Sequence, residues 1–95
     1  MLIMNILLTV NDEADVDAIR GLLTEQARLS RAEPGCIQFD AYQSNVDPKR
    51  FILHERWQSQ AALDEHRKAT AYTTIYQPQV LPKVTREGHP STLLE

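Results

Sequence analysis

The most informative stretch of the sequence is CIQFDAYQSNVDPKRFILHERWQ, residues 36–58. It holds two strand patterns, one on either side of a turn signal. In the first half, Ile37, Phe39 and Ala41 alternate with polar residues, which is typical of a half-buried strand. A turn that contains proline follows at residues 45–48, and the second half returns as a β-rich run. We therefore predict an antiparallel hairpin with a loop of several residues.

The segment before the hairpin predicts a strand and then a helix. Residues 3–10 are β-rich, and Asn11 or Asp12 is placed to cap a helix whose first turn is acidic. The residues expected to face inward on this helix recur at helical spacing: Val16, Ile19, Leu22, Leu23, Gln26 and Ala27. Residues 32–35, AEPG, end this helix because a proline disfavours helical geometry in the residue before it.

After the hairpin the sequence predicts two helices and a strand. Their expected bounds are a helix from Gln60 to about Lys68, a helix from Thr70 to about Gln77-Pro78, and a strand over residues 84–94. Ser59 and Thr70 are the expected caps of the two helices. The strand is expected to be interrupted near Gly88-His89-Pro90.

The order of elements, β-α-β-β-α-(α)-β, predicts an α+β protein with the ferredoxin-like split βαβ arrangement. In that arrangement a four-stranded antiparallel sheet carries its helices on one face. No repeat or linker divides the chain, so residues 1–95 are expected to form a single domain. No element is left for the other sheet face, so we expect a second copy to cover it in a homodimer, although a polar face could also be solvated.

The composition excludes several classes of protein. Hydrophobic residues make up 42% of the 95 residues and charged residues 24%, as in globular domains. A net charge of −3 argues against a nucleic-acid partner, and no apolar stretch of about 18 residues exists to span a membrane. The apolar start has no basic residues before it, so we interpret it as a strand and not a signal peptide. A single cysteine, Cys36, fits a reducing, cytoplasmic location.

Two segments carry a family resemblance: EPGCIQFDAYQS at residues 33–44 and RFILHERWQSQAALDEHRKATAY at residues 50–72. They contain an E-P-G-C turn opening a strand, a strand ending E-R-W, a Ser-capped helix with A-L-x-x-H, and a T-x-Y start to the next helix. This pattern resembles the antibiotic biosynthesis monooxygenase family, small dimeric α+β barrels that include quinol monooxygenases and cofactor-free oxygenases. The same fold also hosts haem-degrading enzymes, isomerases and stress proteins, so the resemblance does not by itself name a reaction.

His66 is the candidate catalytic residue. It lies three residues after Leu63 on the predicted helix, so the two side chains share a face and His66 lies at or beside the core. An imidazole titrates near neutral pH and can accept a proton from a phenolic substrate. The alternative is a structural histidine bonded to a backbone carbonyl under the helix.

Four further residues are candidates for substrate binding: Trp57, Tyr72, Asn5 and Arg86. Trp57 can wall an aromatic pocket or serve only as core. Tyr72 matches the family position nearest the cavity, while Asn5 is polar where an apolar residue is expected. Arg86 could offset negative charge on a substrate or could lie in water.

Glu55 is harder to interpret, because it shares strand parity with Phe51, Leu53 and Trp57. A carboxylate among such neighbours should be paired or should have a raised pKa. Arg56 cannot be its simple partner, since adjacent strand residues point to opposite faces. We expect an edge position, or a partner across the dimer, to explain it.

The sequence holds no motif for a cofactor or a metal. Its three glycines are scattered and its three histidines lack metal-ligand spacing, so we expect the protein to work without a cofactor. The leading hypothesis is a cofactor-independent monooxygenase acting on an electron-rich aromatic, a quinol or polyphenol, with oxygen. The alternatives are a non-catalytic small-ligand or stress-response domain on the same dimeric scaffold, and a haem-degrading monooxygenase.

Overall fold

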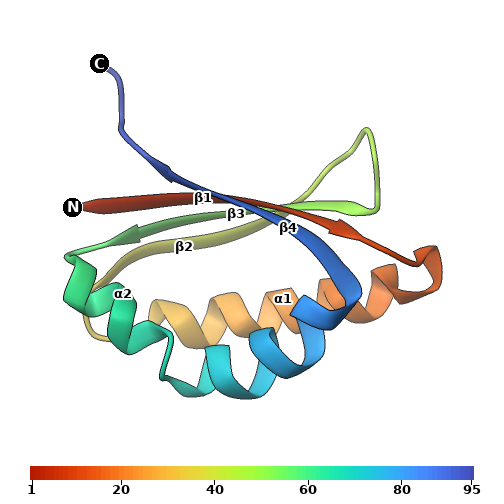
Figure 1. The fold of residues 1–95 in the computed structure, drawn as a ribbon, viewed down its shortest axis with the longest axis horizontal. Coiled ribbons are helices and arrows are strands. Elements are labelled where there is room, and N and C mark those ends of the chain that lie inside the picture. Colours follow the sequence, from red (N-terminus) through yellow and green to blue (C-terminus); the bar gives the residue numbers. More distant parts are fainter.

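The computed structural model describes residues 1–95 as one layer of sheet covered by one layer of helices (Figure 1). The strands are β1 (Leu2–Val10), β2 (Cys36–Gln43), β3 (Arg50–Trp57) and β4 (Val84–Ser91). All pairs are antiparallel and the order across the sheet is β2-β3-β1-β4. The helices are α1 (Val16–Arg31), α2 (Gln60–His66) and η2 (Ala71–Val80), with short 3-10 turns at Glu13–Asp15 and Leu81–Lys83. The predicted fold class, a ferredoxin-like α+β arrangement, is confirmed.

The core lies between the two layers, where strand and helix periodicities meet. Alternate residues of the two central strands point to the helices, and Leu8, Val10 and Leu53 are almost fully buried there. Helix α1 supplies Ile19 and Leu23 at helical spacing from the other side. The predicted caps Asp12 and Ser59 accept backbone hydrogen bonds from Ala14 and Ala62 at 2.9 and 3.2 Å.

Two predictions for the strands are wrong: the side-chain alternation at the start of β2 and the interruption of β4. The pairing of β2 with β3 shifts register between Cys36 and Gln38, and this irregularity leaves Ile37 55% exposed and not on the core face with Phe39. Strand β4 runs without interruption to Ser91. It is an edge strand, and an edge position tolerates the missing N–H of Pro90.

The helix η2 also differs from its prediction. It continues through Pro78 to Val80 with the wide turns of a π-helix, and the N–H of Leu81 donates to the carbonyl of Tyr76 five residues earlier. Gln79 Nε2 donates to the Thr74 carbonyl at 2.7 Å, which satisfies an acceptor in the widened turn. Thr70 precedes the helix but its side chain makes no capping bond.

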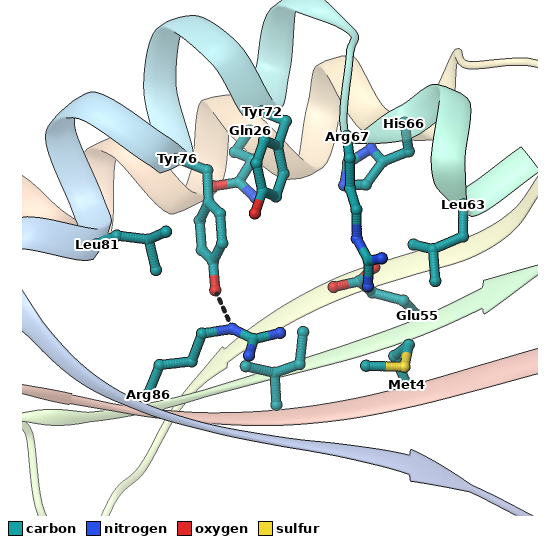
Figure 2. A pocket seen from close by; sticks show the side chains of 11 residues that line it. Met4, Gln26, Glu55, Leu63, His66, Arg67, Tyr72, Tyr76, Leu81 and Arg86 are labelled. Atoms are coloured by element: carbon teal, nitrogen blue, oxygen red, sulfur yellow. Dashed lines mark hydrogen bonds between the residues drawn. The ribbon is translucent and has the colours of Figure 1, made fainter.

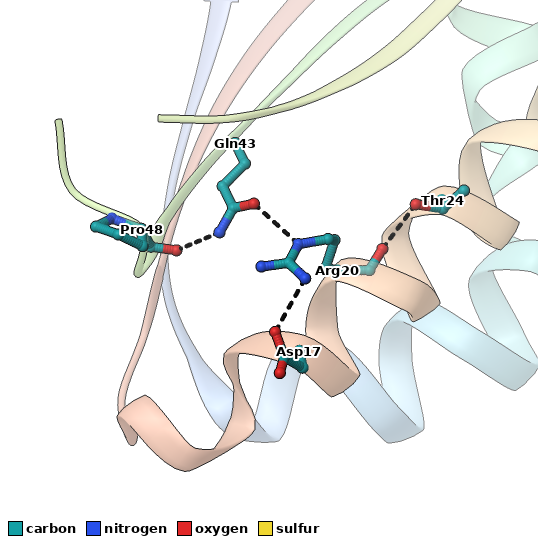
Figure 3. A network of polar contacts seen from close by, with 5 residues as sticks. All are labelled: Asp17, Arg20, Thr24, Gln43 and Pro48. Atoms are coloured by element: carbon teal, nitrogen blue, oxygen red, sulfur yellow. Dashed lines mark hydrogen bonds and ion pairs between the residues drawn. The ribbon is translucent and has the colours of Figure 1, made fainter. Parts of the chain in front are cut away.

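A polar network ties α1 to the β2–β3 hairpin (Figure 3). Arg20 pairs with Asp17 at 2.9 Å and donates from Nε to Gln43 Oε1 at 2.9 Å. Gln43 in turn donates to the Pro48 carbonyl at 2.8 Å. These exposed contacts contribute little energy each, but they hold the loop of the hairpin against the start of the helix.

The second face of the sheet carries no helix (Figure 1). Apolar side chains on this open face include Ile3, Leu7, Ile52 and the 51% exposed Tyr42. Polar groups lie among them, and His54 Nδ1 lies 2.7 Å from Asn5 Oδ1. No helix is both long and apolar enough to cross a membrane.

Replacing Gly35 with alanine should destabilise the fold. Gly35 has φ +81°, and an added Cβ would lie 2.5 Å from the Ala62 Cβ on α2. A non-glycine residue in this region costs about 1–3 kcal/mol, before the clash is counted. The melting temperature of Gly35→Ala measured by circular dichroism should therefore fall.

Gly21→Ala is the matched control, because Gly21 lies inside α1 with nothing within 4 Å of the new methyl group. Alanine there should stabilise the helix by roughly 0.5–1 kcal/mol. Equal melting temperatures for the two variants would contradict the role assigned to the Gly35 turn.

Candidate active site

A cavity of about 200 Å³ lies between the sheet and the helices (Figure 2). Its sheet side is lined by Met4, Ile6, Glu55 and Arg86, and its helix side by Gln26, Leu63, His66, Arg67, Tyr72, Tyr76 and Leu81. Apolar walls with a few convergent polar groups are the usual composition of a small-molecule site. Three of the predicted site residues, His66, Tyr72 and Arg86, are brought together here.

His66 reaches the cavity because α2 is short and directly follows β3. The Ser59 cap starts the helix, and Leu63 and His66 are its two buried residues, as their spacing predicts. His66 Nδ1 lies 2.7 Å from Glu33 Oε1, in the turn before β2. Its other nitrogen, Nε2, has no hydrogen bond to the protein. The partner is therefore a carboxylate, and not the backbone carbonyl of the alternative, purely structural interpretation.

Aromatic rings surround the His66 imidazole. The Trp57 ring centroid lies 4.5 Å away at an interplanar angle of 35°, and the Tyr72 ring meets it edge-on at 5.8 Å. Trp57 is fully buried and lies behind His66, so it does not line the cavity itself. Its place in the site is to support the imidazole.

Arg86 and Tyr76 form the opposite end of the cavity (Figure 2). Arg86 Nε donates to the Tyr76 hydroxyl oxygen at 3.1 Å, and the Tyr72 and Tyr76 ring centroids are 5.3 Å apart. Burial raises the pKa of Tyr76 to about 12 although Arg86 opposes the shift, so this phenol stays protonated at neutral pH. The guanidinium lies over Gly88, where an added Cβ would meet Nη1 at 2.8 Å.

Glu55 is a cavity residue, which corrects the expectation of an edge position or a partner across a dimer. Strand β3 is interior, between β2 and β1, and Glu55 points to the helix side with only 4% of its surface exposed. Trp57 Nε1 donates to Glu55 Oε1 at 2.9 Å. Burial raises the pKa of Glu55, against the opposing effects of the Trp57 hydrogen bond and the His66 charge.

No group of three or more histidine, cysteine, aspartate or glutamate side chains could hold a metal ion. Burial, with Glu33 and Glu55 nearby, raises the pKa of the Cys36 thiol to about 11. The thiol is therefore protonated at neutral pH and is neither a strong nucleophile nor a ready ligand. The chemistry of this cavity belongs to its imidazole, carboxyl, phenol and guanidinium groups.

The family is decided by comparison with known sequences. Residues 1–77 match the model of antibiotic biosynthesis monooxygenases. The chain belongs to this family. It is also 42% identical over 69 residues to "Putative monooxygenase Rv0793" of Mycobacterium tuberculosis, a match that spans 73% of this chain and 66% of that relative, slightly under two thirds of its length.

Solved structures share the fold. The structure of Rv0793 superposes with a TM-score of 0.81 at 31% identity, covering 100% of this chain and 98% of that one. A protein of Nitrosomonas europaea, named "Putative antibiotic biosynthesis monooxygenase", has a TM-score of 0.85 at 24% identity and shares the fold over 98% of this chain and 99% of its own.

The remaining predicted residue, Asn5, lies outside the cavity of this family member. It points to the open face of the sheet, where its Nδ2 donates to Ser91 Oγ at 2.9 Å and its Oδ1 contacts His54. Residues of β1 that face the helices have even numbers, such as Met4 and Ile6. Strand alternation therefore excludes Asn5 from the site.

Gln26 is a cavity residue that sequence reasoning did not single out. It is 1% exposed, and its Oε1 has no hydrogen-bond partner in the protein. Unpaired buried polar atoms are rare, because each costs about 1–3 kcal/mol. The available signal was a glutamine within the inward stripe of α1.

Glu55→Gln should change how stability depends on pH. A carboxyl whose folded-state pKa is raised stabilises the fold fully below the unfolded-state value of about 4.3, and this contribution is lost as pH rises towards the folded-state pKa. The unfolding free energy of the wild type, relative to Glu55→Gln, should therefore fall by up to about 1.4 kcal/mol per pH unit in that window. Urea unfolding between pH 4 and pH 8 measures this.

Glu65→Gln provides the control, because the Glu65 side chain is 74% exposed and pairs only with a surface lysine. Its stability relative to the wild type should not vary systematically with pH. If the unfolding free energy of the wild type rises with pH relative to that of Glu55→Gln, the raised pKa of the Glu55 carboxyl is contradicted.

Proposed function

We propose that this protein is a cofactor-independent monooxygenase that oxidises an electron-rich aromatic, a quinol or polyphenol, with molecular oxygen. The observation that carries the proposal is the state of His66. Its Nδ1 is held by Glu33 at 2.7 Å, its ring is packed between aromatic side chains, and its Nε2 is left without a protein partner beside the cavity. A general base needs such fixed orientation and a free lone pair.

The first step is proton transfer from the substrate hydroxyl to His66 Nε2. The neutral ring donates its Nδ1 proton to the Glu33 carboxylate, which leaves Nε2 as the acceptor. When Nε2 takes up a proton, the imidazolium forms beside that carboxylate, and the ion pair stabilises it. The substrate becomes an anion, which gives up an electron to oxygen more easily than the neutral phenol does.

The electrons for oxygen reduction come from the substrate. The anion passes one electron to O2, and the resulting radical pair combines at a ring carbon to form a hydroperoxide, to which His66 returns its proton. Cleavage of the O–O bond then leaves one oxygen on the ring and releases the other as water. The sum is quinol + O2 → hydroxyquinone + H2O, so no separate reductant is required.

The other cavity residues bind and shield the substrate. Tyr72 offers an aromatic face for an aromatic ring, and Arg86 supplies positive charge that stabilises an oxyanion. Trp57 supports His66 from behind, with no contact to the substrate. The walls of the cavity, whose volume is about 200 Å³, shield part of a bound substrate from bulk water.

We further propose that the open sheet face pairs with a second copy of the chain. Its partly or fully exposed apolar residues, Leu7, Ile52 and Tyr42, form a surface that a domain of this size gains stability by burying. A two-fold pairing would place the Asn5 and His54 polar groups close to their copies, and these groups can then set the register of the two sheets.

His66→Asn should abolish most turnover while keeping the fold. The asparagine amide can still donate to Glu33 near the position of Nδ1, but the Nε2 base is missing. A positioned general base contributes about 10²–10⁴-fold in rate, so kcat with menadiol should fall by that factor. Oxygen uptake, corrected for a no-protein control, measures kcat, and circular dichroism checks the melting temperature.

Two results would contradict this proposal. A wild-type protein that binds menadiol without consuming oxygen above the control would be a ligand-binding domain. A His66→Asn variant that melts several degrees lower but retains wild-type kcat would make His66 a packing residue.

Static light scattering at micromolar concentration should give the mass of a dimer. The change Leu7→Asp places a charge in the open face and should shift the protein towards monomer, whereas the distant exposed change Thr24→Asp on α1 should not. A monomeric wild type would remove the homodimer from the proposal.

A further inference from the structure

Glu55 is the only carboxyl that lines the cavity, and the proton transfer at His66 does not use it. It is 4% exposed, so almost none of its carboxyl is solvated by bulk water. Its Oε1 accepts from Trp57 Nε1 at 2.9 Å, and its Oε2 has no hydrogen bond to the protein. A buried carboxyl with one oxygen anchored and the other free beside a cavity is arranged to exchange a proton with whatever occupies that cavity.

The charged and titratable groups around Glu55 come from four elements. His66 ends α2 and Arg67 follows it as the C-cap, while Arg86 lies on β4, Tyr76 on η2 and Cys36 on β2. The two arginines would favour a carboxylate, yet neither makes an ion pair with it within 4 Å. Desolvation is the largest influence and favours the neutral carboxylic acid.

We propose that Glu55 is the acid of the reaction, and that its carboxyl protonates the oxygen that leaves as water. This inference rests on the proposed monooxygenase function. His66 and Glu55 then divide the proton transfers: the imidazole removes the proton of the substrate hydroxyl, and the carboxylic acid supplies a proton to the leaving oxygen. Two titratable groups with different surroundings in one site are the usual means of combining base and acid catalysis.

The step balances in atoms and electrons. In the ring hydroperoxide, the O–O bond breaks and its outer oxygen, as OH, takes the Glu55 proton and leaves as water. The C–H bond at the same ring carbon breaks, its electron pair forms the new C=O bond, and its proton passes to the Glu55 carboxylate. The ring carbon is oxidised by two electrons, the peroxide oxygen is reduced by two, and Glu55 returns to its acid form.

Without this acid the hydroperoxide has another way to decompose. The C–O bond can break in place of the O–O bond, which releases hydrogen peroxide and leaves the unhydroxylated quinone, with the sum quinol + O2 → quinone + H2O2. The ratio of hydroxyquinone to hydrogen peroxide therefore reports on proton delivery. A purely structural role of Glu55, as the acceptor for Trp57, would not change this ratio.

The experiment compares the wild type with Glu55→Gln, using menadiol as the substrate. Glutamine keeps the size of the side chain and an oxygen that accepts from Trp57, but it has no acidic proton. We expect a fall in kcat for hydroxylation of about 10²-fold or more and a shift of product from hydroxyquinone to quinone and hydrogen peroxide. The alkaline limb of the pH profile of kcat, which reports loss of the acid, should also disappear. Glu65→Gln, on the exposed side of α2, should match the wild type in all three measurements.

The outcomes separate this inference from the proposed function. If the wild type does not oxidise menadiol, the monooxygenase function fails and the acid role fails with it. If the wild type hydroxylates menadiol and Glu55→Gln keeps the same product ratio and pH profile, only the acid role is overturned. An infrared spectrum adds a readout that needs no turnover: a protonated carboxyl band at pH 7 that is absent from Glu55→Gln supports the role, and its absence from the wild type overturns it.

Discussion

The contact between the Trp57 and His66 rings joins the sheet to the helix that carries the candidate base. Helix α2 has only seven residues, too few to be stable alone, so its position depends on what it packs against. Trp57 ends β3 and lies fully buried under the imidazole, with ring centroids 4.5 Å apart. The short Gln58-Ser59 connection and the Gly35 turn leave the helix little freedom to move. The orientation of the base is therefore a result of core packing.

The same packing explains why the site contains buried polar groups that a stability argument would reject. A domain of 95 residues has a limited apolar core, and only 23 residues are buried. Four of these are polar or charged, Gln26, Ser30, Glu55 and His66, and all but Ser30 line the cavity. Glu55 and His66 each have one hydrogen-bond partner, and Gln26 Oε1 has none. Buried polar groups that cost stability and face one cavity are typical of a functional site.

The two faces of the sheet carry different sets of side chains, because successive residues of a β-strand point to opposite faces. The helix face holds the core and the cavity, including Glu55 from β3 and Arg86 from β4. The open face holds Asn5, His54 and the apolar residues proposed to meet a second chain. A one-residue change of register in β1 would exchange these roles, so the pairing of β1 with β3 protects the site as well as the fold.

The elements that depend on local chemistry could be predicted from the residue pattern alone: the hairpin, the inward face of α1, the Asp12 and Ser59 caps, and the shared face of Leu63 and His66. These follow from periods of two and 3.6 residues and from side chains that bond nearby backbone. Tertiary structure alone decided the contacts between distant segments. It paired His66 with Glu33, 33 residues away, and placed Glu55 beside the cavity on an interior strand. In the assembled sheet, Asn5 lies on the face opposite the cavity, and β4 continues through Pro90 because it is an edge strand. Strand order and edge position are properties of the whole sheet and not of any one segment.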